Sequence, residues 1–278
     1  MPLLFVFAVI AFAAIPLTDH PVDSRSIITG MNKGIAQAKT LTYRMVYTER
    51  LDEGVIHIDS STVKFQRTPH KIFMKMSDGA EVLWCSDINN NNAWVHPNSF
   101  PFVTLELDPD GAIMRKNQHH GVENAGYDYF EKILEQAATK VGKDFDSHFL
   151  YLGEIVYRGI HCYNVDVIDP AFKYIHYVVL KGETIMSIAK KLWLNEYMIM
   201  QYNKLNSYND VSEGQTIMVP CDYGKQITLY LDKATMLPVL LRVDDDKGLF
   251  EQYVFVNVKL NPPLTMADFT KDNKEYHF

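Results

Sequence analysis

Residues 176–220 have the sequence HYVVLKGETIMSIAKKLWLNEYMIMQYNKLNSYNDVSEGQTIMVP, in which local signals predict a strand, two helices and a second strand. The first strand stops before Gly182, and Thr184 can cap a helix whose apolar residues recur at helical spacing. Asn195 can cap the second helix, and Gly214 turns the chain into the closing strand. This stretch is therefore predicted to be a compact βααβ unit.

The chain on both sides of this unit has the sequence pattern of β-strands. Apolar runs, several of them alternating with polar residues, are separated by turn signals such as Asp-Pro-Asp-Gly at residues 108–111. The strands are expected at residues 43–48, 55–66, 71–76, 81–86, 103–107, 149–157, 160–168, 227–232, 238–243 and 249–260. Turns at this spacing indicate an antiparallel sheet.

Two helices are expected outside the inserted unit. One covers residues 24–39, with Ser24 or Ser26 as its cap, and the other covers residues 127–141 and ends at Gly142. The fold class is therefore α+β, a curved antiparallel sheet with helices.

The βααβ unit divides the β-rich domain into two parts. The expected organisation is a first part at residues 24–169, a module at 174–221 and a second part at 226–278. Because the terminal strands of the module should pair, its ends should lie close together. We therefore expect that the module can be removed without unfolding its host.

Several short motifs of the inserted unit stand at fixed spacings. They are Tyr177-Val178-Val179, Gly182-Glu183-Thr184, Ser187-Ile188-Ala189, Asn203, Leu205, Gly214-Gln215-Thr216-Ile217 and Val219-Pro220. On these residues the unit resembles the LysM family of peptidoglycan- and chitin-binding modules. Glu183 stands where the family commonly has Asp, and Met186 and Met200 replace more usual residues, but neither departure affects the expected fold.

The LysM resemblance implies a ligand, a glycan that contains N-acetylglucosamine, held in a shallow groove between two loops. The implied contact residues are Gly182, Glu183, Thr184, Ile185, Asn206, Ser207, Tyr208 and Val211. Backbone amides and carbonyls in these loops can match an acetamido group, and Tyr208 could stack on a sugar face. The alternative is that Gly182, Glu183 and Thr184 are only turn and cap residues of a module that no longer binds.

The last fifty residues carry a second, weaker resemblance. Its motifs are Leu231-Asp232, Met236-Leu237-Pro238-Val239, Gly248-Leu249-Phe250-Glu251-Gln252-Tyr253-Val254-Phe255, Val258-Lys259-Leu260-Asn261-Pro262 and Ala267-Asp268-Phe269. On these the domain is similar to the LolA-like, lipoprotein-carrier superfamily, and to a secreted bacterial family that shares this half-barrel. The resemblance implies a strongly curved sheet around helices and an apolar cavity that can accept acyl chains.

Large apolar residues at alternate strand positions would line such a cavity. The candidates are Tyr43, Met45, Tyr47, Phe65, Met74, Met76, Trp84, Tyr253 and Phe255. Methionine suits an adaptable pocket, and the chain has 12 of them. The alternative is that these side chains fill a solid core, which is the usual role of apolar residues with period two.

Composition excludes several classes of protein. At 47% hydrophobic and 22% charged residues the chain is neither disordered nor a multi-span membrane protein. The net charge of −7 and the lack of a basic cluster argue against nucleic acid as a partner. The three cysteines Cys85, Cys162 and Cys221 are far apart, so they predict neither a disulfide framework nor a zinc site, and at most one pair could bridge.

No catalytic or metal-binding motif stands out. Adjacent residues of a strand point to opposite faces, so His119-His120 and His161-Cys162 cannot serve one metal or form a dyad unless they lie in an irregular loop. The aspartates at 244–246 precede Lys-Gly and are expected to form a hairpin turn. We therefore expect no catalytic residue, no metal and no cofactor.

Residues 3–15 form an unbroken apolar run of the length of a signal-peptide core. An Ala-x-Ala site predicts cleavage after Ala13, so residues 1–13 would be a signal peptide and the mature protein secreted and periplasmic. No Lys or Arg precedes the run, which leaves open an uncleaved anchor or a buried N-terminal helix.

The sequence thus predicts a non-enzymatic protein of the cell envelope. Its LysM module would bind peptidoglycan and tether a carrier-like domain that binds a lipid, a lipoprotein acyl chain or another apolar group. The alternatives are a wall hydrolase that the module targets to its substrate, and a structural wall-linking protein whose host domain has a filled core.

Overall fold

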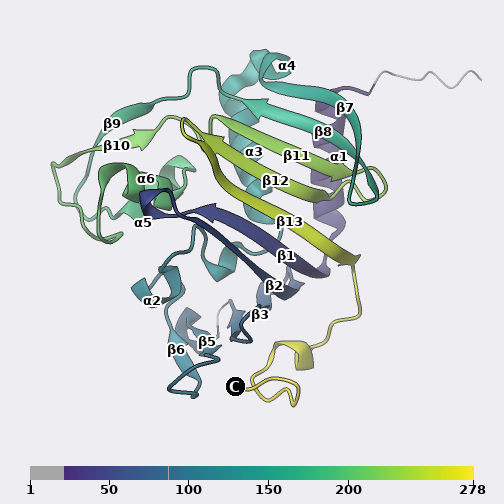
Figure 1. The fold of residues 1–278 in the computed structure, drawn as a ribbon, viewed down its shortest axis with the longest axis vertical. Helices are drawn as coiled ribbons and strands as arrows, with labels where there is room; N and C mark the ends of the chain where they lie inside the picture. Colours follow the sequence, from purple (N-terminus) through teal and green to yellow (C-terminus); the bar gives the residue numbers. More distant parts are fainter. Residues whose placement is uncertain (1–21, 87) are drawn as a thin grey trace, which may run out of the picture.

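The computed structural model describes residues 22–86 and 88–278, and a curved antiparallel sheet of eleven strands dominates it (Figure 1). The strands of this sheet are β1 (Thr40–Arg50), β2 (Ile56–Gln66), β3 (Lys71–Met76), β4 (Glu81–Cys85), β5 (Ala93–His96), β6 (Leu105–Leu107), β7 (Phe149–Tyr157), β8 (Ile160–Ile168), β11 (Gln226–Asp232), β12 (Pro238–Asp245) and β13 (Gly248–Leu260). Their order is β6-β5-β4-β3-β2-β1-β13-β12-β11-β8-β7.

The strand order confirms the predicted insertion. β8 pairs with β11, although 57 residues separate Ile168 from Gln226 in the chain (226 − 168 − 1). The segment between them forms a separate two-stranded sheet of β9 (Tyr174–Val178) and β10 (Thr216–Pro220), with α5 (Ile185–Leu192) and α6 (Glu196–Asn203) between these strands. The host sheet therefore closes without the inserted module.

Two longer helices lie together on one face of the sheet, α1 (Ser24–Gln37) and α3 (Asp128–Val141) (Figure 1). Asp23 caps α1 in a capping box with Ser26, so the prediction that Ser24 or Ser26 is the cap was wrong by one to three residues. Asp accepts hydrogen bonds from free helix N–H groups as well as Ser does, and it stands first in the sequence. Gly142 ends α3 with a positive φ of 54°, as predicted.

Shorter elements complete the host domain. They are α2 (Ala112–Arg115), α4 (Phe145–His148) and the 3-10 turns Asp52–Gly54, Asn89–Asn91, Val122–Asn124, Gly142–Asp144 and Met266–Phe269. Neither α2 nor β5 was predicted, because elements of four residues are too short to show a period.

The main apolar core lies between the inner face of the sheet and the helices. It joins Ile27, Met31 and Ile35 of α1 to Phe130 and Leu134 of α3 and to the alternate apolar residues of the strands. The predicted α+β class, a curved antiparallel sheet with an inserted βααβ unit, is thus confirmed. Within the described residues, no helix is long and apolar enough to cross a membrane. The predicted signal peptide, residues 1–13, lies outside the described residues.

The inserted module has caps and a core of its own. Thr184 and Asn195 cap α5 and α6 as predicted, and Trp193 and Lys204 end them with positive φ. The module's apolar core, however, also contains Leu51 and Phe250 of the host. The module is therefore packed onto the sheet rather than free of it.

Candidate functional site

The two loops that were predicted to bind a glycan lie side by side. The backbone N–H of Ile185, in the first loop, donates to the carbonyl of Tyr208, in the second, at 2.9 Å. A cleft of about 420 Å³ opens beside this bond, and four of the eight predicted contact residues line it: Thr184, Asn206, Ser207 and Tyr208. The fold thus brings half of the predicted set together in one place.

The other four predicted residues have local roles. Gly182 turns the chain with φ of 78° and is exposed. The carboxylate of Glu183 accepts from the Leu180 N–H and the Tyr177 hydroxyl, both at 2.9 Å, and from Lys191 at 3.0 Å. The first of these bonds is the main cause that holds the Glu183 pKa below its ordinary value. The side chains of Ile185 and Val211 pack on the module's core instead of lining the cleft.

Tyr208 does not present an open ring to a ligand. It is 9% exposed, and the guanidinium of Arg115, from the host, lies over its ring at 5.6 Å from the ring centre. A sugar could stack on this face only if Arg115 moved away. Host residues therefore reach into the module's predicted glycan groove.

The predicted apolar cavity exists in the host domain, with a volume of about 260 Å³. Six of the nine predicted residues line it: Met45, Tyr47, Met74, Met76, Tyr253 and Phe255. The remaining three, Tyr43, Phe65 and Trp84, belong to the filled core beside it. The predicted residues are thus divided between the lining of this pocket and the packed core beside it. Ile113 of α2 also lines the cavity and is 72% exposed, so the cavity reaches solvent beside α2.

One end of the cavity is polar, and the strand register explains why. β1 and β13 pair so that Met45 faces Phe255, Tyr47 faces Tyr253, and Glu49 faces Glu251. The same alternation that carries apolar side chains inward thus places two carboxylates opposite each other. Like charges in this position are destabilising unless other groups compensate them.

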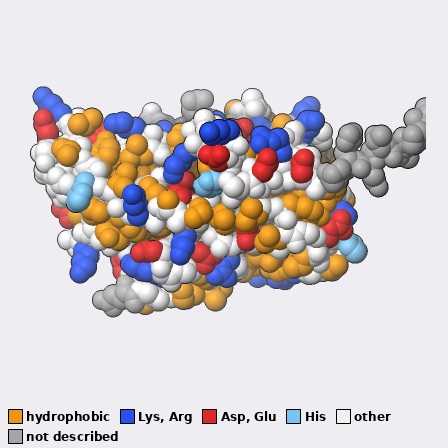
Figure 2. All heavy atoms as spheres, turned by 90° about the horizontal axis from the view of Figure 1, so that it is seen from above, with side chains coloured by type: hydrophobic (Ala, Val, Ile, Leu, Met, Phe, Trp, Pro, Cys, Tyr) orange, Lys and Arg blue, Asp and Glu red, His pale blue; other side chains and the backbone are white. Residues whose placement is uncertain are grey.

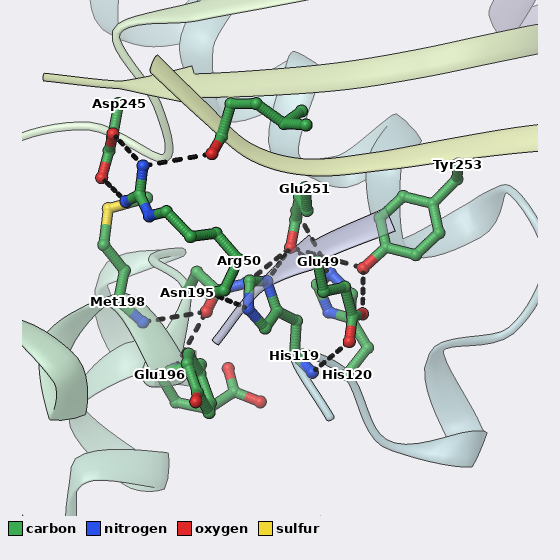
Figure 3. Close-up of polar contacts among 12 residues, drawn as sticks. Glu49, Arg50, His119, His120, Asn195, Glu196, Met198, Asp245, Glu251 and Tyr253 are labelled. Carbon is green, nitrogen blue, oxygen red and sulfur yellow. Dashed lines mark hydrogen bonds and ion pairs between the residues drawn. The ribbon is translucent and has the colours of Figure 1, made fainter. Parts of the chain in front are cut away.

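A buried polar cluster supplies that compensation (Figure 3). Glu251, with no exposed surface, lies 2.9 Å from Nδ1 of His119 and 3.2 Å from Nε2 of His120. It also accepts from the Tyr223 hydroxyl at 2.8 Å and from the Asn195 amide at 3.2 Å. Its carboxylate is thus held by donors from separate segments of the chain.

Glu49 is satisfied in the same cluster. It accepts from the Tyr253 hydroxyl at 2.7 Å and from the backbone N–H of His119 at 3.3 Å. Both inward carboxylates are therefore hydrogen-bonded, as buried charges in stable proteins usually are.

The cluster shifts the pKa values of its members in opposite directions. Burial alone would raise the pKa of Glu251, but the charges of His120 and His119 and their hydrogen bonds hold it well below its ordinary value. Burial alone would lower the pKa of His120, but the charge of Glu251 and its hydrogen bond raise it. The contact between Glu251 and His120 therefore favours the charged form of each group over its neutral form.

This arrangement is the exception that the sequence analysis left open for a histidine pair in an irregular loop. His119 and His120 lie in a bend outside any strand, so the rule that neighbours point to opposite faces does not apply, and both rings contact Glu251. The hairpin expected at the three aspartates is present, although only Asp246 lies in the turn, because Asp244 and Asp245 belong to the end of β12. Cys85, Cys162 and Cys221 are free cysteines. Within residues 22–86 and 88–278, no three His, Cys, Asp or Glu side chains stand together as metal ligands.

Two family models match separate parts of the chain. Residues 177–220 match the LysM domain family. Residues 38–171 match a family described as a protein of unknown function, DUF1571. No curated protein matches the chain by sequence.

Solved structures resemble the chain only distantly. It is similar to a LolA-superfamily protein from Nitrosomonas europaea, with 10% identity and a TM-score of 0.34, over 90% of this chain and 99% of that one. It is also similar to the lipoprotein LppX from Mycobacterium tuberculosis, with 13% identity and a TM-score of 0.40, over 87% and 97%. A protein of the DUF1329 family from Desulfovibrio piger has 11% identity and a TM-score of 0.35, over 89% and 96%. At these values the likeness carries no statement about function.

The LysM module is attached to the host through α6. Asn195, which caps this helix, accepts from the N–H groups of Tyr197 and Met198 and donates to Glu251 (Figure 3). Glu196 forms a buried ion pair with Arg115. The carboxylate of Glu251 thus lies near the positive end of the α6 dipole, where a negative charge is favourable.

A second buried ion pair supports this attachment from the host side. Arg50, at the end of β1, pairs with Asp245 of β12 and donates to the Leu249 carbonyl at 3.1 Å. The turn aspartates were expected only to form a hairpin, so this pairing was missed. It fixes the end of β1 from which Leu51 reaches the module's core.

Proposed function

We propose that the protein binds peptidoglycan glycan strands in the cleft between the two loops of its LysM module. The observation that carries this proposal is the LysM match at residues 177–220 together with the convergence of Thr184, Asn206, Ser207 and Tyr208 on one cleft. On the face seen in Figure 2, basic and acidic side chains are interspersed among apolar ones, and neither sign of charge forms a continuous patch there.

Sedimentation with purified sacculi tests this function. Ser207→Trp places a bulky side chain in the cleft, and we expect it to weaken retention by about tenfold or more. Ser212→Trp is the matched control, because Ser212 is exposed in the same loop but does not line the cleft. Equal retention of the two variants would contradict the cleft as the glycan site.

We propose further that the host cavity binds an acyl chain or another apolar group. The support is its lining of methionines and other large apolar side chains, which can adapt to a flexible chain. Met76→Trp should fill the cavity and abolish binding of a fluorescent fatty-acid probe. Ile58→Trp, an exposed position on β2, should leave probe binding unchanged. Probe binding that survives Met76→Trp would contradict the cavity as the binding site. No probe binding by the unmodified chain would favour the filled-core, wall-linking alternative, which the packed residues Tyr43, Phe65 and Trp84 support.

We propose a binding role, in the periplasm, rather than catalysis. Among the described residues, the buried cluster around Glu49 and Glu251 attaches the module to the host, and both carboxylates are hydrogen-bonded. Incubation with peptidoglycan or muropeptides should therefore release no product above the blank. Release of product that is lost in a His120→Gln variant would favour the wall-hydrolase alternative.

A further inference from the structure

We propose that the host segment 108–117 forms the second wall of the LysM glycan site, so that the site is a composite of module and host. This inference rests on the proposed binding of glycan by the module. It differs from a tethering role, in which the module alone would bind the glycan and the host would make no contact with it.

The cleft beside the module's loops has two sides of different origin. The module supplies Thr184, Met186, Tyr197, Met200 and residues 206–209. The host supplies Asp52, Asp108, Asp110, Ala112, Arg115, Lys116 and Asn117. Figure 1 shows α2, within this host segment, next to α5 and α6. A ligand in the module's groove would therefore contact the host as well.

Arg115 holds the host wall in place. It is 2% exposed, forms the buried ion pair with Glu196 of α6, and donates to the His119 carbonyl at 3.2 Å. The pair is anchored on both sides, because Glu196 belongs to the docked first turn of α6. The width of the cleft is thus set by a fixed contact rather than by a loose loop.

The same two side chains that meet across the cleft have unused hydrogen-bonding groups. Among the described residues, Nε and Nη1 of Arg115 and the hydroxyl of Tyr208 are buried with no hydrogen bond of regular geometry, although the guanidinium lies against the Tyr208 ring. Burial raises the pKa of Tyr208 to about 12, so its hydroxyl keeps its proton and can donate. Buried donors without acceptors are unfavourable, and a ligand that brings acceptors would satisfy them once Arg115 or Tyr208 shifts toward the cleft.

The rim of the cleft carries both kinds of polar group. Asp108 and Asp110 offer acceptors, whereas Lys116 and Asn117 offer donors. A glycan with hydroxyl and acetamido groups can use both kinds, because it donates through O–H and N–H and accepts through its oxygens. The volume of about 420 Å³ lies within the roughly 300–1,000 Å³ that is typical of small-ligand sites.

The test uses variants on the host wall alone, in the full chain. Ala112 is exposed and lines the cleft from the host side, so Ala112→Trp should block the cleft. We expect retention on purified sacculi to fall about tenfold or more. Ala36→Trp is the matched control, at an exposed alanine of α1 that lines neither the cleft nor the cavity.

A second variant removes polar groups instead of filling space. Lys116→Ala combined with Asn117→Gly deletes two rim donors, and glycine tolerates the positive φ of 56° at position 117. Retention should fall about three- to tenfold. Lys143→Ala, an exposed lysine outside the cleft, should have no effect.

The outcomes separate this inference from the proposed function. If the unmodified chain binds sacculi, Ser207→Trp abolishes binding, and both host-wall variants bind like their controls, the composite site is wrong and the module binds alone. If the unmodified chain does not bind sacculi, the proposed function itself fails.

Discussion

Helices α5 and α6 of the LysM module have the same length and opposite environments. α5 buries Ile185, Ile188 and Ala189 and leaves its lysines, Lys190 and Lys191, exposed. α6 buries five consecutive residues, Glu196 to Met200, because the host covers the side that the module's own core does not. α5 therefore has the amphipathic pattern of a surface helix, whereas α6 lies in the interface between module and host.

This difference indicates how the module is used. A module that served only as a tether would need one anchored end and a free surface. Here α6 is docked through Asn195 and Glu196, so the orientation of the cleft relative to the cavity is fixed. The two sites also share α2, whose Ile113 lines the cavity and whose Ala112 lines the cleft.

Excision of the module should have the largest effect. A short glycine-serine link in place of residues 174–223 would uncover Leu51 and Phe250, which are buried against α6 and its neighbours, and would also remove the Asn195 and Tyr223 donors of Glu251. Losing the burial of these two side chains should lower the free energy of unfolding by about 3–6 kcal/mol. Urea unfolding of the truncated chain measures this. A host of unchanged stability would restore the original expectation of an independent module.

Glu251→Gln should weaken the docking almost as much. The change leaves His119 and His120 without the carboxylate that pairs with them, and breaking a buried pair costs about 3–5 kcal/mol. Arg25→Ala, which removes an exposed pairing with Asp146, is the control and should change stability little. A loss below about 1 kcal/mol for Glu251→Gln would mean that the cluster does not hold the interface.

The pH dependence of stability should reveal His120. Its folded pKa is raised above the unfolded value of about 6.5, so its contribution is complete below that pH and is lost as the pH rises through the folded pKa. Each unit of pKa shift corresponds to about 1.4 kcal/mol. His120→Gln should therefore show a flatter profile above about pH 6.5 than the unmodified chain. Parallel pH–stability profiles of the variant and the unmodified chain would show that His120 does not contribute to the pH dependence.

The smallest effect should come from the outer face of α2. Ile113→Ser reduces the apolar lining at the mouth of the cavity, and we expect fatty-acid probe affinity to fall about threefold, because only part of one side chain is lost. Sacculus retention should stay unchanged, since Ile113 does not line the cleft. A fall in sacculus retention would instead show that Ile113 also contributes to glycan binding in the cleft.

The module and the host differ in how far the sequence reveals them. Caps, turns and helical periods lie within a few residues of each other in the module, so Thr184, Asn195 and the two loops could be predicted. The inward alternation of β1 and β13 also predicted residues of the cavity. Continued by two positions, from Tyr47 to Glu49 and from Tyr253 to Glu251, the same alternation would have indicated two inward carboxylates.

The partners of those carboxylates were not predictable. His119, Asn195 and Tyr223 come from three segments far apart in the chain, and only the tertiary fold brings them to Glu251. The host wall of the cleft was not predictable for the same reason. α2 is too short to show a helical period, and its contact with α6 joins Arg115 to Glu196, which are 81 residues apart in the chain.

Hydrogen exchange of the full chain, with and without a soluble N-acetylglucosamine oligomer, tests the composite cleft most directly. A ligand held between the two walls should slow exchange both in the module's loops, residues 182–185 and 206–209, and in the host segment 108–117. Slower exchange in the module's loops alone, with the host segment unchanged at saturating oligomer, would contradict a site shared by module and host.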